Sequence, residues 1–347
     1  MRQIASVLVL AVLLPGCSSV RQAPPEPAAP PPAASRFAFV NDPWINLHHL
    51  LYHWALADAP PPPPGQRRSP RVEVAERSQT AALTPEERQA WDAAVSYYQR
   101  ELSRFSLLFD RNMVDLRSRI ARISAHPEEL SSLPHAEVFE PAMAVYRRHW
   151  WPAHEALNQT WIDQLLPKLE TFEPLLAPRL VEAFGGRFPA EKIRVDLCAY
   201  SDWTGAYTTG VPPHIVISSK DPDLRDLHAL EIVFHEVSHI DPIESPLHAM
   251  LEKGFAKHGG KPPENLWHYF IFHTAGALTN EALRSQGLPE IVPYPERTGM
   301  YRRIPTWNRY REVLDRSWKE FLAGRMEREA AIDRIAREIL THPMRGS

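Results

Sequence analysis

The sequence is poor in cysteine and carries little net charge. Its 347 residues include only two cysteines, Cys17 and Cys198, so no disulfide framework is expected. The formal net charge of -3 gives no electrostatic reason to expect DNA or RNA as a partner. Glycine is also sparse, with 14 residues, whereas proline is abundant, with 35. Hydrophobic residues make up 44% of the chain, which is enough for a sizeable core and argues against general disorder.

The N-terminus has the features of a targeting signal. Arg2 precedes an apolar run over residues 4–14, which is too short to cross a bilayer as a helix. The run ends in Leu14-Pro15-Gly16-Cys17, which resembles the lipobox of bacterial lipoproteins. The resemblance implies that residues 1–17 are a signal peptide ending at Cys17, which becomes the lipidated first residue of the mature protein. An ordinary secretory signal is the alternative.

The residues after Cys17 bear on where the anchor holds the protein. Ser18 and Ser19 follow the cysteine, a pattern that resembles outer-membrane cargo among Gram-negative lipoproteins. Residues 18–36 are rich in proline and alanine, so they favour polyproline II and have no core to fold. We therefore expect a protein of the bacterial cell envelope, lipid-anchored to the outer membrane, facing the periplasm and held on a tether over residues 18–36.

Residues 37–186 are expected to form a mainly helical region. A helix is predicted over 37–56, beginning near Asn41-Asp42-Pro43, and five consecutive prolines predict a loop over 58–80. Thr84-Pro85-Glu86-Glu87 has the form of a capping box, and helical periodicity continues from it to about Ile123. Further helices are predicted over 136–151, 153–166 and 169–184, with Gly185-Gly186 ending the last one.

The pattern changes after Phe188. Alternating apolar residues predict a strand over 193–200, in which Cys198 is a small buried residue. Residues 201–213 are rich in turn formers, and 214–218 is predicted to be a second strand. We expect a short antiparallel sheet directly before a helix over 226–240, followed by a helix over 266–286 and by one or two amphipathic helices over 306–341. The predicted class is α+β and mostly α-helical, with the helical region followed by this second region over 187–347.

The helix over 226–240 contains a His-Glu-x-x-His pattern, His235-Glu236-Val237-Ser238-His239. Residues four apart lie about 40° apart around a helix, so two imidazoles can converge on one Zn2+. Glu236 can then reach a water at the open position of the metal and act as its general base. The helix is otherwise apolar, so its polar side chains need partners. The alternatives are ordinary core histidines, or a metal site without catalysis.

Residues 193–286 resemble the zincin metallopeptidases, in which an antiparallel sheet precedes the active-site helix. The resemblance implies a zinc metallopeptidase with His235 and His239 as metal ligands and Glu236 as general base. It also implies that an edge strand lines the cleft and pairs with an extended substrate, the place taken here by residues 214–218. The zincin-like region spans residues 187–347, and the helical region is not covered by the resemblance.

The third metal ligand is open between two main candidates. Pro242 and Ser245 stand where metzincins have glycine and histidine, which excludes that subclass. His268 lies among apolar residues and needs a partner such as a metal. Trp267-His268, together with the later step from Phe272 to Gly276, resembles uncharacterised bacterial zincin-like sequences.

Glu281 is the alternative third ligand, because its surroundings resemble the stretch that supplies the ligand in gluzincins. It follows His268 by 13 residues, so the two point about 140° apart on one straight helix and cannot both face the metal. We prefer His268. Further candidates are His273, Glu244 and His248.

Other polar residues are candidates to support the site. Glu231 is four residues before His235 and can accept its free N–H, and Asp241 can do so for His239 or cap the chain before Pro242. The candidates for oxyanion stabilisation are Tyr207, Tyr294, Tyr301 and Arg302. His49 and His53 are spaced to share a metal, but polar or half-buried positions in an amphipathic helix are the simpler interpretation.

Two classes of function follow from these features. The first is a hydrolase with one Zn2+ ion, acting on protein or peptidoglycan peptides or, with the same residues, on a non-peptide ester or amide. The second is a non-catalytic envelope lipoprotein that binds a partner through its helical region, with a structural or vestigial metal site. Glu236 favours catalysis, because a structural zinc needs no base and prefers four protein ligands. The expected partners are a protein or peptide substrate and the membrane, through the lipid anchor; no nucleic acid is expected.

Overall fold

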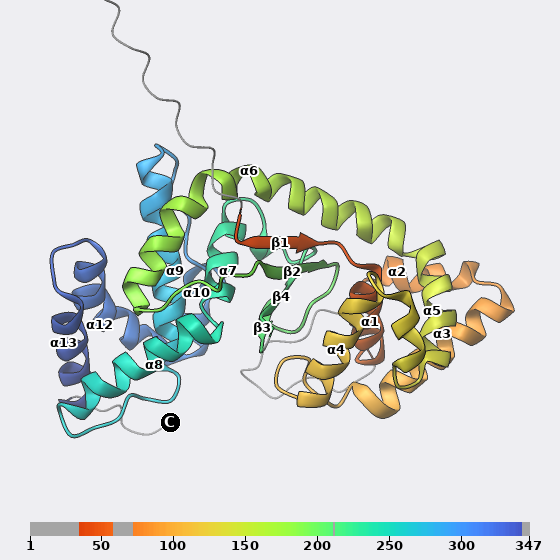
Figure 1. The fold of residues 1–347 in the computed structure, drawn as a ribbon, viewed down its shortest axis with the longest axis horizontal. Coiled ribbons are helices and arrows are strands. Elements are labelled where there is room, and N and C mark those ends of the chain that lie inside the picture. The colour runs from red at the N-terminus through yellow and green to blue at the C-terminus, as the bar shows by residue number, and fades with distance from the viewer. Residues whose placement is uncertain (1–34, 58–71, 211, 342–347) are drawn as a thin grey trace, which may run out of the picture. The chain divides into compact units, whose positions relative to one another are not determined.

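A computed structural model describes residues 35–57, 72–210 and 212–341. The predicted signal peptide with Cys17, the tether up to residue 34 and residues 58–71 of the proline-rich loop therefore lie outside the described residues. The structure is 67% helical with one small sheet, so the predicted α+β, mostly helical class is confirmed (Figure 1). Among the described residues, no helix has the length and apolar character needed to cross a membrane.

The N-terminal half begins with a short strand and continues as helices. The predicted helix starts are confirmed, since Asp42 caps α1 and both hydrogen bonds of the Thr84–Glu87 capping box form at the start of α3. Gly185 ends α6 with a left-handed φ of 77°. The elements are β1 (Phe37–Val40), α1 (Pro43–Ala55), α2 (Val74–Ser78), η1 (Gln79–Ala82), α3 (Pro85–Tyr97), the π-helical turn η2 (Tyr98–Leu102), α4 (Arg111–Ile123), η3 (Pro127–Ser132), α5 (Ala136–His149) and α6 (Trp151–Phe184).

Three helix predictions in this half were wrong in their bounds. Residues 37–40 form β1, because Asp42 starts α1 only after them. The helix predicted to reach Ile123 breaks at residues 103–110, where Asp110 caps α4 by accepting two backbone N–H groups. The helices predicted over 153–166 and 169–184 form the single helix α6, which continues through its internal prolines.

The C-terminal half contains the rest of the sheet and a second group of helices. Helix α8 was not predicted. Pro242 stands in its first turn, a position that favours proline because the N–H that proline lacks would have no partner there. The elements are β2 (Ile193–Cys198), β3 (Ala206–Thr209), β4 (His214–Ser218), η4 (Pro222–Leu224), α7 (His228–Val237), α8 (Asp241–Ala256), α9 (Leu266–Ser285), α10 (Tyr294–Arg297), α11 (Met300–Arg303), α12 (Pro305–Leu322) and α13 (Arg328–Thr341).

The sheet is mixed rather than antiparallel, which corrects the prediction. Its strand order is β1-β2-β4-β3. Strand β2 pairs in parallel with β1 and with β4, and only β3 runs antiparallel, against β4. Residues 214–218 are therefore an inner strand. The edge strand that contacts α7 is β3, from the segment predicted as turns.

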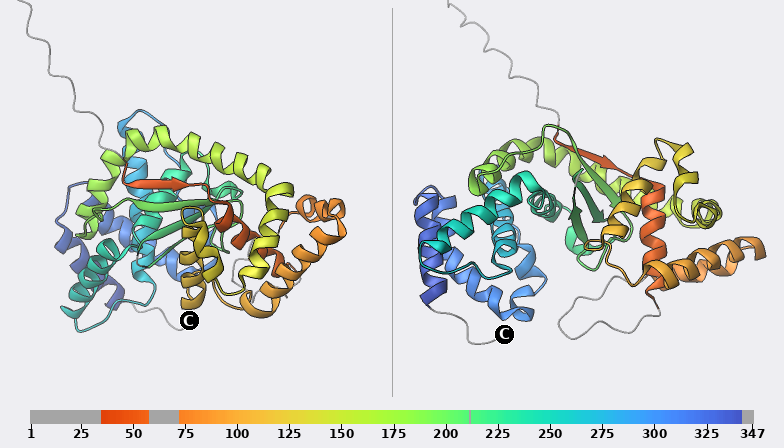
Figure 2. Two further views of the ribbon diagram at one scale, coloured as in Figure 1. Left: turned by 45° about the vertical axis from the view of Figure 1, so that its right-hand side comes forward. Right: turned by 60° about the horizontal axis from the view of Figure 1, so that its bottom comes forward.

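The sheet lies between two hydrophobic cores, because side chains alternate between its faces along each strand. On β2, Val195 and Leu197 pack with the core that includes α6, α7 and α9. Cys198 packs with the core of α1 and α3 to α5, and is buried as predicted. Helix α6 packs against β2 and also contacts α7 and α9 (Figure 2). Because α6 contacts both β2 and α7, it fixes the helix of the His-Glu-x-x-His motif relative to the sheet.

A buried ion cluster joins β2 to β4 and to α1. Asp196 is fully buried, and its carboxylate accepts hydrogen bonds from Arg194 Nε at 2.7 Å and from His214. Arg194 Nη2 also lies 3.2 Å from Asp42 Oδ2 at the start of α1. Burial raises the pKa of Asp196, but His214 and Arg194 outweigh burial and lower the pKa to about 2.

Asp196→Asn is expected to lower the free energy of unfolding by about 3 kcal/mol at neutral pH, because Arg194 and His214 lose their buried carboxylate. The folded pKa lies below the unfolded value, so the carboxylate stabilises the fold above about pH 4 and loses this effect as pH falls through about 2. Denaturant titrations should therefore show a gap between wild type and variant that narrows on acidification. The same difference in unfolding free energy at neutral pH and below about pH 2 would contradict a stabilising role of the ionised Asp196. Asp163→Asn, on the exposed side of α6, is the matched control.

Candidate metal centre

Two imidazoles meet at the end of α7. His235 lies in the last turn of the helix, whereas His239 lies just past its end, in a turn where its N–H donates to the Glu236 carbonyl at 3.1 Å. The helix predicted over 226–240 is thus shorter than expected. The two Nε2 atoms are 3.3 Å apart. Two nitrogens bound tetrahedrally to one zinc at about 2.05 Å are also about 3.3 Å apart. The pair therefore has the spacing of two ligands of one ion.

His268 completes a group of three. It lies in the first turn of α9, which packs against α7. One ring nitrogen each of His235, His239 and His268 lies within 4.8 Å of the others. The structure thus brings the two motif histidines together with the preferred third candidate.

The other candidates for the third ligand have partners of their own. Glu281, near the C-terminal end of α9, forms an ion pair of 3.2 Å with Arg179 on α6. Its side chain is 43% exposed, so the structure does not bring this alternative ligand to the site. His273 pairs with Asp315 at 3.1 Å.

Burial keeps His235 and His268 neutral. His235 is only 3% exposed, and burial, with smaller effects of His239 and His268, lowers its pKa well below the usual value. Burial and then His239 lower the pKa of His268 to about 3. A neutral imidazole is the form that binds a metal. Three imidazoles that converge in this way fit a zinc ion, which is bound by nitrogen and sulfur ligands.

Glu244 orients His239, a contact that the sequence did not predict. Glu244 Oε2 lies 3.1 Å from His239 Nδ1, and its Oε1 lies 3.3 Å from His248 Nε2. Donation of the Nδ1 proton leaves His239 Nε2 free to bind a metal. Asp241, which was expected in this role, instead accepts a hydrogen bond from Ser245 at 2.6 Å. Helical spacing could not predict the contact between His239 and Glu244, because a turn separates His239 from α8, the helix that contains Glu244.

Glu231 was expected to accept a hydrogen bond from His235, but the structure does not form this bond. Its Oε1 accepts the N–H of Tyr294 at 2.8 Å. Its Oε2 and His235 Nδ1 are both buried, and neither has a hydrogen-bond partner among the described residues. Burial raises the pKa of Glu231 to about 7, against smaller opposing effects of the Tyr294 N–H and Arg297.

Glu236 is held by the edge strand. The hydroxyl of Thr208 on β3 lies 2.7 Å from Glu236 Oε2 and 2.8 Å from its carbonyl oxygen. Glu236 is 4% exposed, and burial raises its pKa, whereas His239 and Thr208 oppose the rise. The sequence reasoning missed Thr208, because it assigned residues 201–213 to turns.

These residues line a pocket of about 490 Å³, a volume typical of ligand sites. Its walls include the three histidines and Glu236, with Tyr207 and Thr208 of the edge strand. The remaining walls are largely apolar and come from helices α7 to α11, from Ala206 of β3 and from loops. The histidines and the carboxylate therefore face a space that a substrate segment can enter.

The oxyanion candidates differ in their access to this pocket. Tyr207 and Tyr294 line it, whereas Tyr301 and Arg302 do not. The Tyr207 hydroxyl lies 2.8 Å from His49 Nε2, and the Tyr294 hydroxyl donates to the Thr204 carbonyl at 3.2 Å. Because Thr208 faces Glu236, the neighbouring Tyr207 side chain points to the opposite face of the sheet, into the core of α1, so Tyr294 is the candidate that the geometry retains.

The histidines of α1 do not converge on a metal. His49 has Ile45 O at 2.8 Å from Nδ1 and the Tyr207 hydroxyl at the other ring nitrogen. His53 Nε2 contacts the Ser201 carbonyl. Both rings are fully buried and have partners within the protein, so they need no metal. The simpler interpretation was wrong about their exposure, because α1 is buried from Ile45 to Ala55 rather than amphipathic.

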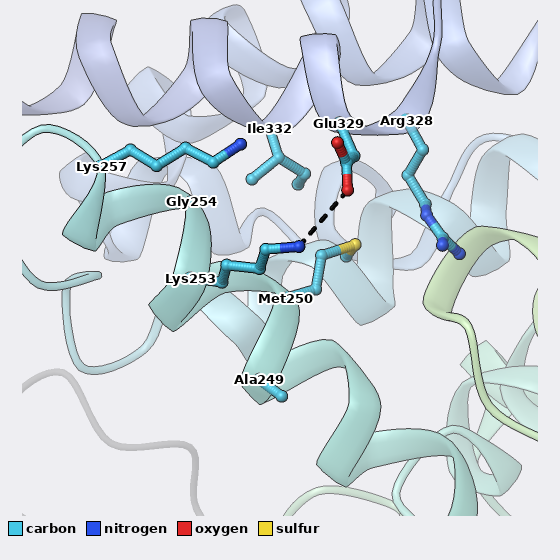
Figure 3. A pocket seen from close by; sticks show the side chains of 8 residues that line it. All are labelled: Ala249, Met250, Lys253, Gly254, Lys257, Arg328, Glu329 and Ile332. Atoms are coloured by element: carbon cyan, nitrogen blue, oxygen red, sulfur yellow. Dashed lines mark hydrogen bonds and ion pairs between the residues drawn. The ribbon is translucent and has the colours of Figure 1, made fainter.

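A smaller pocket lies between α8 and α13, away from the histidines (Figure 3). It has a volume of about 220 Å³, and Lys253, Lys257 and Arg328 line it together with Glu329. Glu329 is 3.5 Å from Lys253. The helices approach closely here, because a Cβ on Gly254 would lie 2.3 Å from Ile332 Cγ2. Cationic side chains are poor metal ligands, so this pocket is no candidate metal centre.

Comparison of the chain with family models, with curated proteins and with solved structures finds no match.

Proposed function

We propose that the protein is a zinc-dependent metallopeptidase of the bacterial cell envelope. The observation that carries the proposal is the meeting of three histidines with Glu236 in one pocket. His235, His239 and His268 would hold the ion, and one open position would remain for chemistry. Glu236 is the general base. The envelope location rests on the lipobox that ends at Cys17.

The geometry supports separate roles for the metal ion and for Glu236 in the reaction. A bound zinc ion supplies Lewis-acid activation of water and of the substrate carbonyl group. Glu236 takes a proton from the attacking water at Oε1, because Oε2 is held by Thr208. The same carboxyl group then gives the proton to the leaving amine.

The edge strand supports a peptide substrate over a non-peptide ester or amide. Within the described ranges strand β3 pairs with β4 on one side only, and its residues line the pocket. The backbone groups on its other side can form hydrogen bonds with an extended peptide, as in β-strand addition. A peptide laid there passes the histidines and Glu236.

A non-catalytic lipoprotein with a structural metal is the second candidate function. Structural zinc sites take four protein ligands. Among the described residues the group comprises three histidines, and the nearby carboxylate of Glu236 is held by Thr208. The ligand number therefore favours the catalytic proposal.

Zinc analysis of the chain purified without chelator tests the proposal. One zinc per chain is expected, with hydrolysis of a peptide library that stops on removal of the metal and returns when zinc is added. Absence of zinc would overturn the proposal. Stoichiometric zinc without hydrolysis of any peptide would favour the structural site.

Thr208→Val is expected to lower kcat by about tenfold, because Glu236 loses the hydroxyl that fixes its carboxylate; such hydrogen bonds to a charged group contribute about 1.5–3 kcal/mol. Zinc content and KM should change little. Thr208→Ser keeps the hydroxyl and should restore most of the rate. If serine and valine lower kcat equally, the hydroxyl does not position Glu236.

A further inference from the structure

Two exposed aromatic side chains lie at the pocket that contains the histidines. Phe109 is 76% exposed and Trp203 is 42% exposed, yet both line this pocket. The other large hydrophobic side chains that are exposed in the described part of the chain do not line it; they are Val74, Leu166, Leu175, Leu288 and Val292. Exposed apolar side chains that gather at one cleft mark a binding surface.

Phe109 projects from an ordered turn between η2 and α4. Ser106 Oγ accepts the N–H of Leu108 at 3.2 Å and that of Phe109 at 3.1 Å. Leu107 is 2% exposed and anchors the turn in the core, and Leu108 packs against the same core. The turn is therefore fixed by Ser106 and Leu107, and it leaves the Phe109 ring exposed.

Trp203 projects from a second ordered turn, between β2 and β3. The buried Asp202 accepts the N–H of Thr204 through Oδ1 at 2.8 Å, and its carbonyl accepts the N–H of Gly205 at 3.2 Å. Tyr294 adds a hydrogen bond to the Thr204 carbonyl. Two segments far apart in the sequence thus present aromatic rings to one pocket.

Much of the remaining lining is also apolar. Ile232, Phe272, Met300 and Ile304 line the same pocket. The charged groups in the lining besides Glu236 are Glu244 and Arg303. Glu244 contacts His239 and His248, and Arg303 donates to the Thr298 carbonyl. The pocket that the two aromatic rings line therefore suits an apolar group.

We infer that Phe109 and Trp203 form a side-chain subsite that selects peptides with a large apolar residue beside the bond to be cleaved. The inference rests on the proposed function, because a peptide paired with β3 directs alternate side chains into the pocket. The Thr208 side chain reaches Glu236, so the substrate residue opposite it lies close to the histidines. A polar residue at that position gains little from the aromatic rings.

The test measures binding separately from cleavage. Short blocked peptides of polar sequence, with one Phe moved through the positions in place of Ser, are titrated by calorimetry into the zinc-loaded Glu236→Gln chain. At one position the peptide with Phe should bind at least about tenfold more tightly than the peptide with Ser. Phe109→Ser and Trp203→Ser, each in the same background, should remove most of this preference. Val74→Ser, an equally apolar change at a residue that is 84% exposed, should keep it.

The outcomes separate the subsite from the reaction. Equal binding of Phe and Ser peptides, or a preference that survives both aromatic substitutions, overturns the subsite. Phe109→Leu should keep the preference, and a loss equal to that of Phe109→Ser would also overturn it. A preference in binding without cleavage by the zinc-loaded wild type overturns the proposed peptidase and leaves the subsite standing.

Discussion

Glu236→Gln is expected to lower kcat/KM for peptide hydrolysis by about 10³-fold, while the chain retains its zinc. The amide has the shape of the carboxylate and still accepts the hydrogen bond from Thr208, which lies 2.7 Å from Glu236 Oε2. It cannot take a proton from water or return one to the leaving amine. The loss should therefore fall on kcat more than on KM.

The variant needs a control for removal of a negative charge. Glu281→Gln makes the same chemical change on α9, where Glu281 pairs with Arg179 and is 43% exposed. Surface ion pairs contribute little to stability, so this control should keep wild-type rates. Metal analysis and steady-state kinetics on both variants decide the matter. Hydrolysis by Glu236→Gln within tenfold of wild type would show that another group is the base.

The motif could be predicted because its geometry is local. His235 and His239 are four residues apart, and this spacing alone brings two side chains to one face of a helix. The structure keeps them together even though α7 ends at Val237 and His239 lies in the following turn. The capping signals at Asp42 and Thr84 are local in the same way, since each side chain accepts N–H groups within three residues.

The edge strand could not be predicted, because its identity depends on pairing over long distances. Strand β4 became an inner strand only because β2 pairs with it in parallel. Strand β1, the first of the described elements, then pairs with the other side of β2. Residues 206–209 contain Tyr207 and two threonines, which suit a strand, but at four residues they are too short for an alternating pattern to stand out among turn formers.

The hydrogen-bond partners of Glu236 and His239 could not be predicted either, because each partner lies on a different element from the motif. Thr208 reaches Glu236 across 28 residues, and Glu244 reaches His239 around a turn between two helices. The break before α4 was also missed, because apolar residues keep their helical spacing through Phe105, Leu108 and Phe109. The spacing is the same whether these residues pack inside a helix or line a pocket from a loop.

His268→Ala is expected to weaken zinc binding by more than about 100-fold, because it removes a direct ligand, whereas loss of an outer-shell partner costs about 10–100-fold. The three ligand atoms lie within 4.8 Å of one another, so two histidines alone would remain. Competition with a chelating dye measures the affinity of each variant for zinc. Hydrolysis at limiting zinc should fall in parallel.

Two residues of the same helix make the comparison decisive. His273→Ala removes an imidazole that pairs with Asp315, and Glu281→Ala removes the carboxylate that pairs with Arg179. Both should bind zinc as wild type does. Residue 273 follows His268 by about 500° of helical rotation and residue 281 by about 1300°, so both side chains leave the face of α9 that meets α7. If Glu281→Ala loses zinc while His268→Ala keeps it, α9 must rotate to bind the ion, and the histidine group is not the metal centre.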